Sequence, residues 1–156
     1  MYDYLKSFLD YLRIERQVSV NTLDAYTRDL TRYLEYLDES QLKQPAQIQH
    51  SHIFAFLEIL HELNLATSSI SRNLSAIRAF HHFLIGERVA DHDPTENIAV
   101  PKPWMKLPEI LNQQEVIRLL EQPDPSTEHG YRDKAMLEFL YATCVRVTEL
   151  VSLRIS

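Results

Sequence analysis

Glycine and cysteine are nearly absent from this sequence of 156 residues. The two glycines, Gly86 and Gly130, are too few for an all-β protein built on tight turns, so helices are favoured. The single cysteine, Cys144, excludes an internal disulfide bond and suits a reducing cytoplasm. No stretch approaches the roughly 18 uncharged apolar residues of a membrane span, and the first residues do not form a signal peptide. We therefore expect a helical, cytoplasmic protein without a membrane segment.

An excess of basic residues is also missing. The 22 acidic residues outnumber the 16 lysines and arginines and give a formal net charge of -6, which argues mildly against a nucleic-acid ligand. The placement of the charges points the other way. No acidic residue lies between Glu62 and Glu87, and this window contains Arg72, Arg78 and many hydroxyl side chains. We expect phosphate groups to bind there.

Apolar residues recur at helical spacing in four stretches, at about 2–16, 23–37, 53–63 and 70–84. With short joins between them, these stretches predict a small helical bundle that ends near Val89. Ser19 or Asn21 is the expected N-cap of the second helix, and Thr67 or Ser68 that of the fourth.

Prolines between Pro94 and Pro108 then predict an extended linker. Asn112 is expected to cap a short helix, and a last helix should begin near Tyr131 and break at 143–145 before it resumes. The expected domains are therefore a bundle at 1–90, a linker at 91–107 and a second domain at 108–156.

Five segments match a known pattern in order along the chain: 21–30 (NTLDAYTRDL), 72–80 (RNLSAIRAF), 107–111 (LPEIL), 132–137 (RDKAML) and 141–150 (YATCVRVTEL). They resemble the tyrosine recombinases of the phage-integrase family, most closely its Xer-type members. The first two segments are similar to the second and fourth helices of the family's core-binding domain, and the others to the start of its catalytic domain. The resemblance implies an all-α fold: a four-helix SAM-like core-binding domain, a linker, and the first helices of a truncated catalytic domain.

In this family a tyrosine attacks a DNA phosphodiester and forms a 3′-phosphotyrosyl intermediate, without metal, nucleotide or other cofactor. The resemblance implies a double-stranded DNA recombination site as partner, other recombinase protomers in a tetrameric synapse, and a role such as chromosome segregation. The family's nucleophile and most of its active site follow the part that this chain matches. We expect the chain to be the DNA-binding, N-terminal portion of such an enzyme and inactive by itself.

Arg146 lies inside the apolar segment 141–151. From the residues alone it is either a structural partner of Glu149, three positions on, or a phosphate ligand, because a guanidinium offers two parallel donors and a permanent charge. In the family, the arginine at this position is the first of two that hold the scissile phosphate. The resemblance therefore implies a catalytic role for Arg146.

Two neighbours of Arg146 need separate interpretation. Cys144 stands where the family usually has glycine, at a bend that can require a positive φ. We expect its side chain to be small, apolar and buried rather than a reactive thiol. Tyr141 is not expected to be the nucleophile, because the family packs this aromatic inside its helix.

Polar residues opposite the apolar stripes of the second and fourth helices form the expected DNA-binding surface, because the family places these two helices in the DNA groove. The set also includes Arg78, on the flank of the fourth helix, and one lysine of the linker. The expected DNA-contact residues are Asn21, Thr22, Arg28, Arg32, Ser68, Arg72, Ser75, Arg78 and Lys102. A solvated helix face is the alternative for each residue, and Asp24, Asp29 and Glu35 lie on the same or adjacent faces. The adjacent His81 and His82 do not predict a metal site, since they point about 100° apart and lack a third ligand.

Two other classes of function remain open from the sequence. One is a DNA-binding regulator that derives from a recombinase but does not catalyse. The other is a helical protein-interaction domain, for which the acidic balance is the best argument. Salt-dependent DNA binding distinguishes the interaction domain from both DNA-binding hypotheses.

Overall fold

The computed structural model describes residues 1–99 and 109–154, and these residues form helices and no strand, which confirms the expected all-α fold. The α-helices are α1 (Tyr2–Ile14), α2 (Val20–Glu39), α3 (His50–Glu62), α4 (Thr67–Gly86), α5 (Gln113–Leu120), α6 (Glu128–Thr143) and α7 (Val147–Ser152), with a 3-10 turn, η1 (Pro45–Gln47). The chain divides into two compact units, Met1–Met105 and Lys106–Ser156. The linker lysine Lys102 lies outside the described residues.

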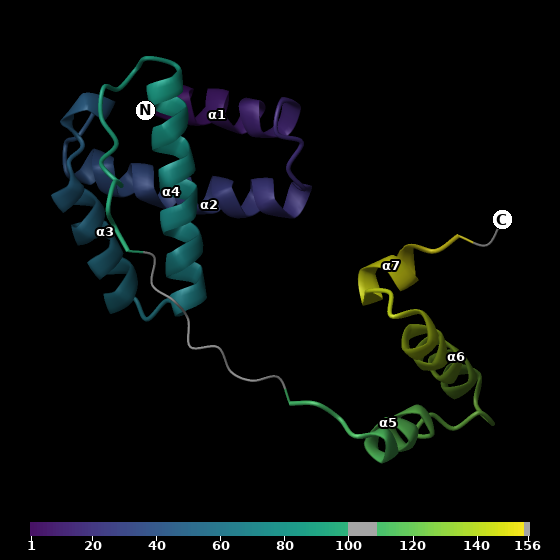
Figure 1. Ribbon diagram of the computed structural model, residues 1–156. Helices are drawn as coiled ribbons and strands as arrows, with labels where there is room; N and C mark the ends of the chain where they lie inside the picture. The colour runs from purple at the N-terminus through teal and green to yellow at the C-terminus, as the bar shows by residue number, and fades with distance from the viewer. Residues whose placement is uncertain (100–108, 155–156) are drawn as a thin grey trace. The chain divides into compact units, whose positions relative to one another are not determined.

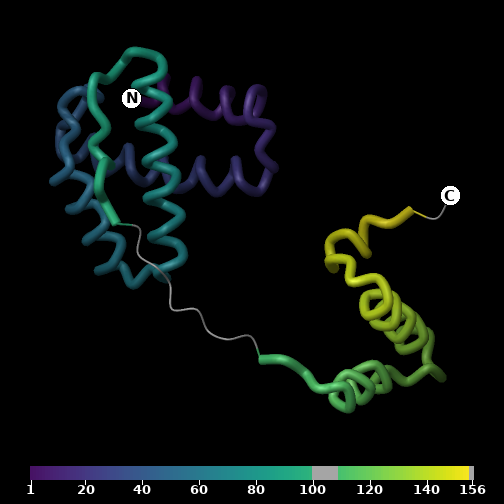
Figure 2. The backbone as a smooth tube through the Cα atoms, viewed as in Figure 1, coloured from purple at the N-terminus to yellow at the C-terminus, as the bar shows by residue number. Residues whose placement is uncertain are grey.

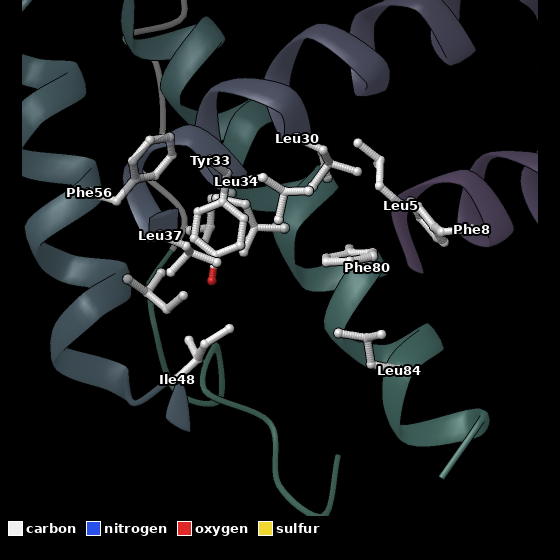
Figure 3. Close-up of a cluster of buried hydrophobic side chains, with 14 of the residues drawn as sticks. Leu5, Phe8, Leu30, Tyr33, Leu34, Leu37, Ile48, Phe56, Phe80 and Leu84 are labelled. Carbon is white, nitrogen blue, oxygen red and sulfur yellow. The ribbon is translucent and has the colours of Figure 1, made fainter. Parts of the chain in front are cut away.

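The first unit is built on α1, α2 and α4, whose apolar stripes close on one another. Figure 1 shows α1 and α2 lying side by side with α4 running across them and α3 packed on the other side of α4. The aromatic rings of Phe8 and Phe80 meet with centroids 5.5 Å apart, and Tyr33 meets Phe56 at 5.3 Å. These side chains lie in one continuous core with Leu30, Leu34 and Leu84 (Figure 3).

Local signals explain where the helices begin. Ser19 is the N-cap of α2, as expected, and its hydroxyl accepts a hydrogen bond from the backbone N–H of Thr22. The expectation for α4 was wrong: α4 begins at Thr67, and Ala66 occupies the cap position without a side-chain hydrogen bond. The N-terminus of α4 is instead fixed by packing, since Ile70 in its first turn is buried in the core.

Residues 90–99, which the sequence assigns mostly to the linker, lie against the bundle. Figure 2 traces this segment as it turns back alongside α4, and Ile98 is buried with the core residues. Side chains of the bundle hold the backbone of this segment. Arg78 donates to the carbonyl oxygen of Ile98 over 2.9 Å, and Nδ1 of His50 lies 3.2 Å from the carbonyl oxygen of Pro94. We call residues 90–99 the returning segment.

The second unit contains α5, α6 and α7, whose ends are defined by local hydrogen bonds. Asn112 caps α5 through a reciprocal pair of hydrogen bonds with Glu115, as expected. Thr127 caps α6 in a tight turn that requires the glycine at 130, because a Cβ there would clash with the carbonyl oxygen of Asp124. Gly130 is the one buried residue that the described part of this unit contains.

Candidate nucleic-acid interface

The two helices expected to bind DNA pack against each other, so their polar faces belong to one rigid part of the molecule. On α2, Asn21, Arg28 and Arg32 are exposed. The side chains of Arg28 and Arg32 make no hydrogen bond or ion pair within the described part of the chain. Both guanidinium groups are therefore available to a ligand. Thr22 is half-buried, and its hydroxyl lies 2.9 Å from that of the cap residue Ser19.

The expected DNA-contact residues of α4 differ in whether their side chains already have a hydrogen-bond partner within the protein. Ser68 is exposed, and its hydroxyl has no partner among the described residues. Ser75 is exposed as well, but its hydroxyl donates to the carbonyl oxygen of Ser71 over 2.9 Å. Arg78 is half-buried, and its hydrogen bond to Ile98 helps to hold the returning segment against the bundle.

Arg72 has a partner that helical periodicity does not predict. Its Nε donates to Oδ2 of Asp29 over 2.7 Å, and one terminal nitrogen donates to Oδ1 over 3.1 Å. Asp29 is only 1% exposed, whereas 45% of the Arg72 side chain is accessible. The hydrogen bonds to this carboxylate raise the pKa of Arg72. A buried anion is thus neutralised by a cation at the surface of α4.

Asn73 of α4 is a second hydrogen-bond partner of Asp29. It is fully buried, and its amide donates to Oδ1 of Asp29 over 3.1 Å and to the carbonyl oxygen of Ser69 over 2.9 Å. Asp29 was expected on or beside the polar face of α2, but it is buried. Its spacing could have indicated this, because it stands three residues after Tyr26 and four before Tyr33 of the apolar stripe. A carboxylate at such a position requires a buried partner.

Arg146 lies in the second unit, at the N-cap position of α7. Its side chain is 83% exposed and donates to Glu149 Oε1 over 3.1 Å, while its backbone N–H donates to Oε2 over 2.8 Å. The structural pair with Glu149, one of the two interpretations of the sequence, therefore exists. Because the guanidinium has five N–H donors, the pair leaves others free for a phosphate.

The break before α7 occurs where the sequence placed it. Cys144 ends α6 with φ of 54°, in the left-handed region that glycine adopts most easily. The expected burial of this side chain was wrong, and Tyr141, expected to pack inside its helix, is exposed too. Both lie in a unit whose described residues provide almost no cover.

The adjacent histidines His81 and His82 both contact other residues of the first unit. His81 is buried, and its Nε2 lies 2.9 Å from the hydroxyl of Tyr33. His82 points to Asp93 of the returning segment, with 2.9 Å between Nε2 and Oδ2. Across residues 1–99 and 109–154, no group of three or more histidine, cysteine or acidic side chains is arranged to hold a metal ion. Nor does any helix in these ranges have the length and apolar character to cross a membrane.

Comparisons with known proteins agree with the resemblance seen in the sequence. Residues 5–88 match the family model described as phage integrase, N-terminal SAM-like domain. That range runs from α1 to just beyond α4 and contains every expected DNA-contact residue except Lys102.

Several curated relatives are named tyrosine recombinase XerD. The protein from Oceanobacillus iheyensis is 47% identical over 153 residues, which is 97% of this chain and 51% of the relative. The one from Chlorobaculum tepidum is 49% identical over 152 residues, covering 96% and 50%. The one from Staphylococcus epidermidis is 42% identical over 149 residues, again covering 96% and 50%. The chain spans about half the length of the curated relatives it matches.

Proposed function

This chain belongs to the phage integrase family, and from that premise we propose that it is the DNA-binding portion of a site-specific tyrosine recombinase. The observation that carries the proposal is that α2 and α4, which pack on each other and are joined by the Asp29–Arg72 contact, both carry exposed arginines. Arg28 and Arg32 project from α2 without protein partners among the described residues, and Arg72 reaches across from α4 with almost half of its side chain accessible. We call Asn21, Arg28, Arg32, Ser68, Arg72 and Ser75 the α2–α4 surface.

The chemistry of this surface suits duplex DNA. Unpaired arginines release counterions from DNA when they bind phosphates, and they can also donate two parallel hydrogen bonds to guanine. Serine hydroxyls such as that of Ser68 suit phosphate oxygens. The acidic residue that contacts Arg72, Asp29, is buried and already neutralised, so it does not repel a phosphate at this point.

The activity of the whole enzyme is part of the same proposal. In it, Arg146 is one ligand of the scissile phosphate, and the nucleophile is a tyrosine of the catalytic domain. The reaction proceeds without metal or other cofactor, in a tetramer of protomers on a recombination site. The compartment is the cytoplasm, and chromosome segregation is the process. In an enzyme with a whole catalytic domain, Arg146→Lys should lower DNA cleavage by several orders of magnitude and change affinity little.

Salt-dependent binding of a DNA duplex tests the proposed function. We expect the chain to bind a fluorescent duplex with an affinity that falls as salt rises, and Arg28→Ala and Arg32→Ala each to reduce the salt slope by about one unit. Arg13→Ala is the control, since Arg13 is an exposed helical arginine of α1 that pairs with Asp10 and lies outside the α2–α4 surface. Equal effects of the three substitutions, or no binding at low salt, would contradict the proposal.

A protein-interaction domain is the second candidate, and one observation favours it. The second unit exposes large apolar side chains on all three of its helices, among them Ile117, Phe139 and Val151. Such surfaces are typical of protein contacts. If this were the main function, the salt titration would show no DNA binding that depends on Arg28 or Arg32.

A further inference from the structure

The Asp29 carboxylate joins the two helices of the α2–α4 surface at one point. It lies on α2, between Arg28 and Arg32 in the sequence, and accepts hydrogen bonds from Arg72 and Asn73 of α4. The carboxylate is buried, but the guanidinium that covers it is not. Asp29 therefore sits directly beneath a residue of the expected interface, yet it is not itself accessible to a ligand.

The contact also fixes the orientation of Arg72. A free arginine side chain samples many rotamers and loses that freedom when it binds a ligand. Here Nε and one terminal nitrogen are already held by the two oxygens of Asp29, over 2.7 and 3.1 Å. The guanidinium has five N–H groups, and the other three have no acceptor within the described residues. Two of these three, one on each terminal nitrogen, form a parallel pair of donors, which we call the free edge of the guanidinium.

We propose that Asp29 is a positioning residue, which holds Arg72 so that the free edge of its guanidinium is presented to DNA. This inference rests on the proposed function and deepens it. It makes the specificity of the α2–α4 surface for DNA depend on a buried carboxylate that does not itself contact DNA. The free edge takes an acceptor pair, either O6 and N7 of a guanine or two phosphate oxygens. Arg28 and Arg32, which have no such partner among the described residues, supply charge.

Asp29→Asn gives the sharpest test, because two explanations predict opposite signs. The substitution removes a negative charge beside DNA, so simple electrostatics predicts tighter binding. If Asp29 orients Arg72, binding should weaken instead by about fivefold to tenfold, since the side chain must be ordered at the moment of binding. The probe is a duplex that the wild-type chain itself selects from a randomised pool.

A double-mutant cycle shows whether Asp29 acts through Arg72. The effect of Asp29→Asn on duplex affinity should disappear in an Arg72→Ala background, because no guanidinium is left to orient. The salt slope of Arg72→Ala separates the two acceptors: a slope lower by about one unit indicates a phosphate, and an unchanged slope with lost sequence preference indicates a base.

Loss of fold is controlled separately. All measurements are made below the melting transition of every variant, which circular dichroism establishes. Leu60→Ala, in the core of α3, weakens the first unit without touching the Asp29–Arg72 pair and should bind the selected duplex like the wild type.

Weaker binding by Asp29→Asn that depends on Arg72 supports the proposal. Unchanged or tighter binding, or additive effects of the two substitutions, overturns it while leaving the DNA-binding function intact. Failure of the wild-type chain to bind any duplex overturns both.

Discussion

The two units of this chain use similar amphipathic helices but reach different degrees of burial. In the first unit, stripes from α1, α2, α3 and α4 meet in one core, where Tyr33 and Phe80 are fully buried. In the second, the apolar residues of α5, α6 and α7 remain largely exposed. Periodicity thus predicts a helix in both places, but it does not say whether the apolar face has been covered.

The comparison also separates two sources of helix stability. Packing stabilises the first unit, which can therefore carry the cost of burying Asp29 and Asn73. Caps and turns define the second: the Asn112–Glu115 pair, the Thr127 cap and the Arg146–Glu149 pair. Local interactions of this kind contribute about 1 kcal/mol each, and short helices are marginal without packing.

Truncating one phenylalanine in each unit should give the largest difference. Phe80 is 0% exposed and Phe139 is 40% exposed. We expect Phe80→Ala to lower the free energy of unfolding by about 3–5 kcal/mol and Phe139→Ala by about 1 kcal/mol or less, as measured by urea denaturation. Equal losses would show that the second unit has a core of its own.

Between about pH 4 and pH 6.5, the pH dependence of stability should come mainly from His81 of the first unit. Burial lowers the pKa of His81 to about 4 from its usual 6.5. Between these values the unfolded chain binds a proton that the folded chain does not, so the free energy of unfolding falls as pH drops, by up to about 3 kcal/mol. In denaturation series at several pH values, His81→Gln should lose this part of the dependence. An identical pH profile for the two proteins would refute the assignment.

A change at Gly130 should affect the second unit alone. Because a Cβ at this position clashes with the backbone of Asp124, Gly130→Ala should destabilise the turn before α6 by about 1–3 kcal/mol. Hydrogen exchange should accelerate in α6 and stay unchanged in α2 and α4. Gly86→Ala is the control, since a Cβ at Gly86 meets no atom within 4 Å. Faster exchange in α2 would mean that the units unfold together.

The smallest expected effect is a gain in stability. Cys144 adopts a positive φ, which costs a residue with a Cβ about 1 kcal/mol. Cys144→Gly should therefore slow hydrogen exchange at the end of α6, whereas Ala142→Gly, inside the same helix, should accelerate it. Faster exchange in Cys144→Gly would show that the turn is not strained by cysteine.

The sequence predicts the helices of this protein better than the contacts between them. The stripes of α2 and α4, the caps Ser19 and Asn112 and the break at Cys144 are local features, encoded within a few residues. The ion pair between Asp29 and Arg72 joins residues 43 positions apart, and the packing of α2 on α4 creates it. Helical periodicity places each side chain on a face but does not identify its partner.

The same limit applies to the returning segment and to the second unit. Asp93-Pro94 correctly indicates the absence of a helix, but proline chemistry does not reveal that Ile98 packs on the bundle. Burial was expected for Tyr141 from the family resemblance and for Cys144 as a small apolar residue. Burial depends, however, on covering atoms that the local sequence does not specify.

NMR titration of the labelled chain with a duplex tests whether the first unit binds DNA through α2 and α4. We predict that the amide signals of α2 and α4 and the Nε signals of Arg28, Arg32 and Arg72 shift as duplex is added, and that those of α1 do not. Shifts confined to α5, α6 and α7, with α2 and α4 unchanged, would contradict the claim.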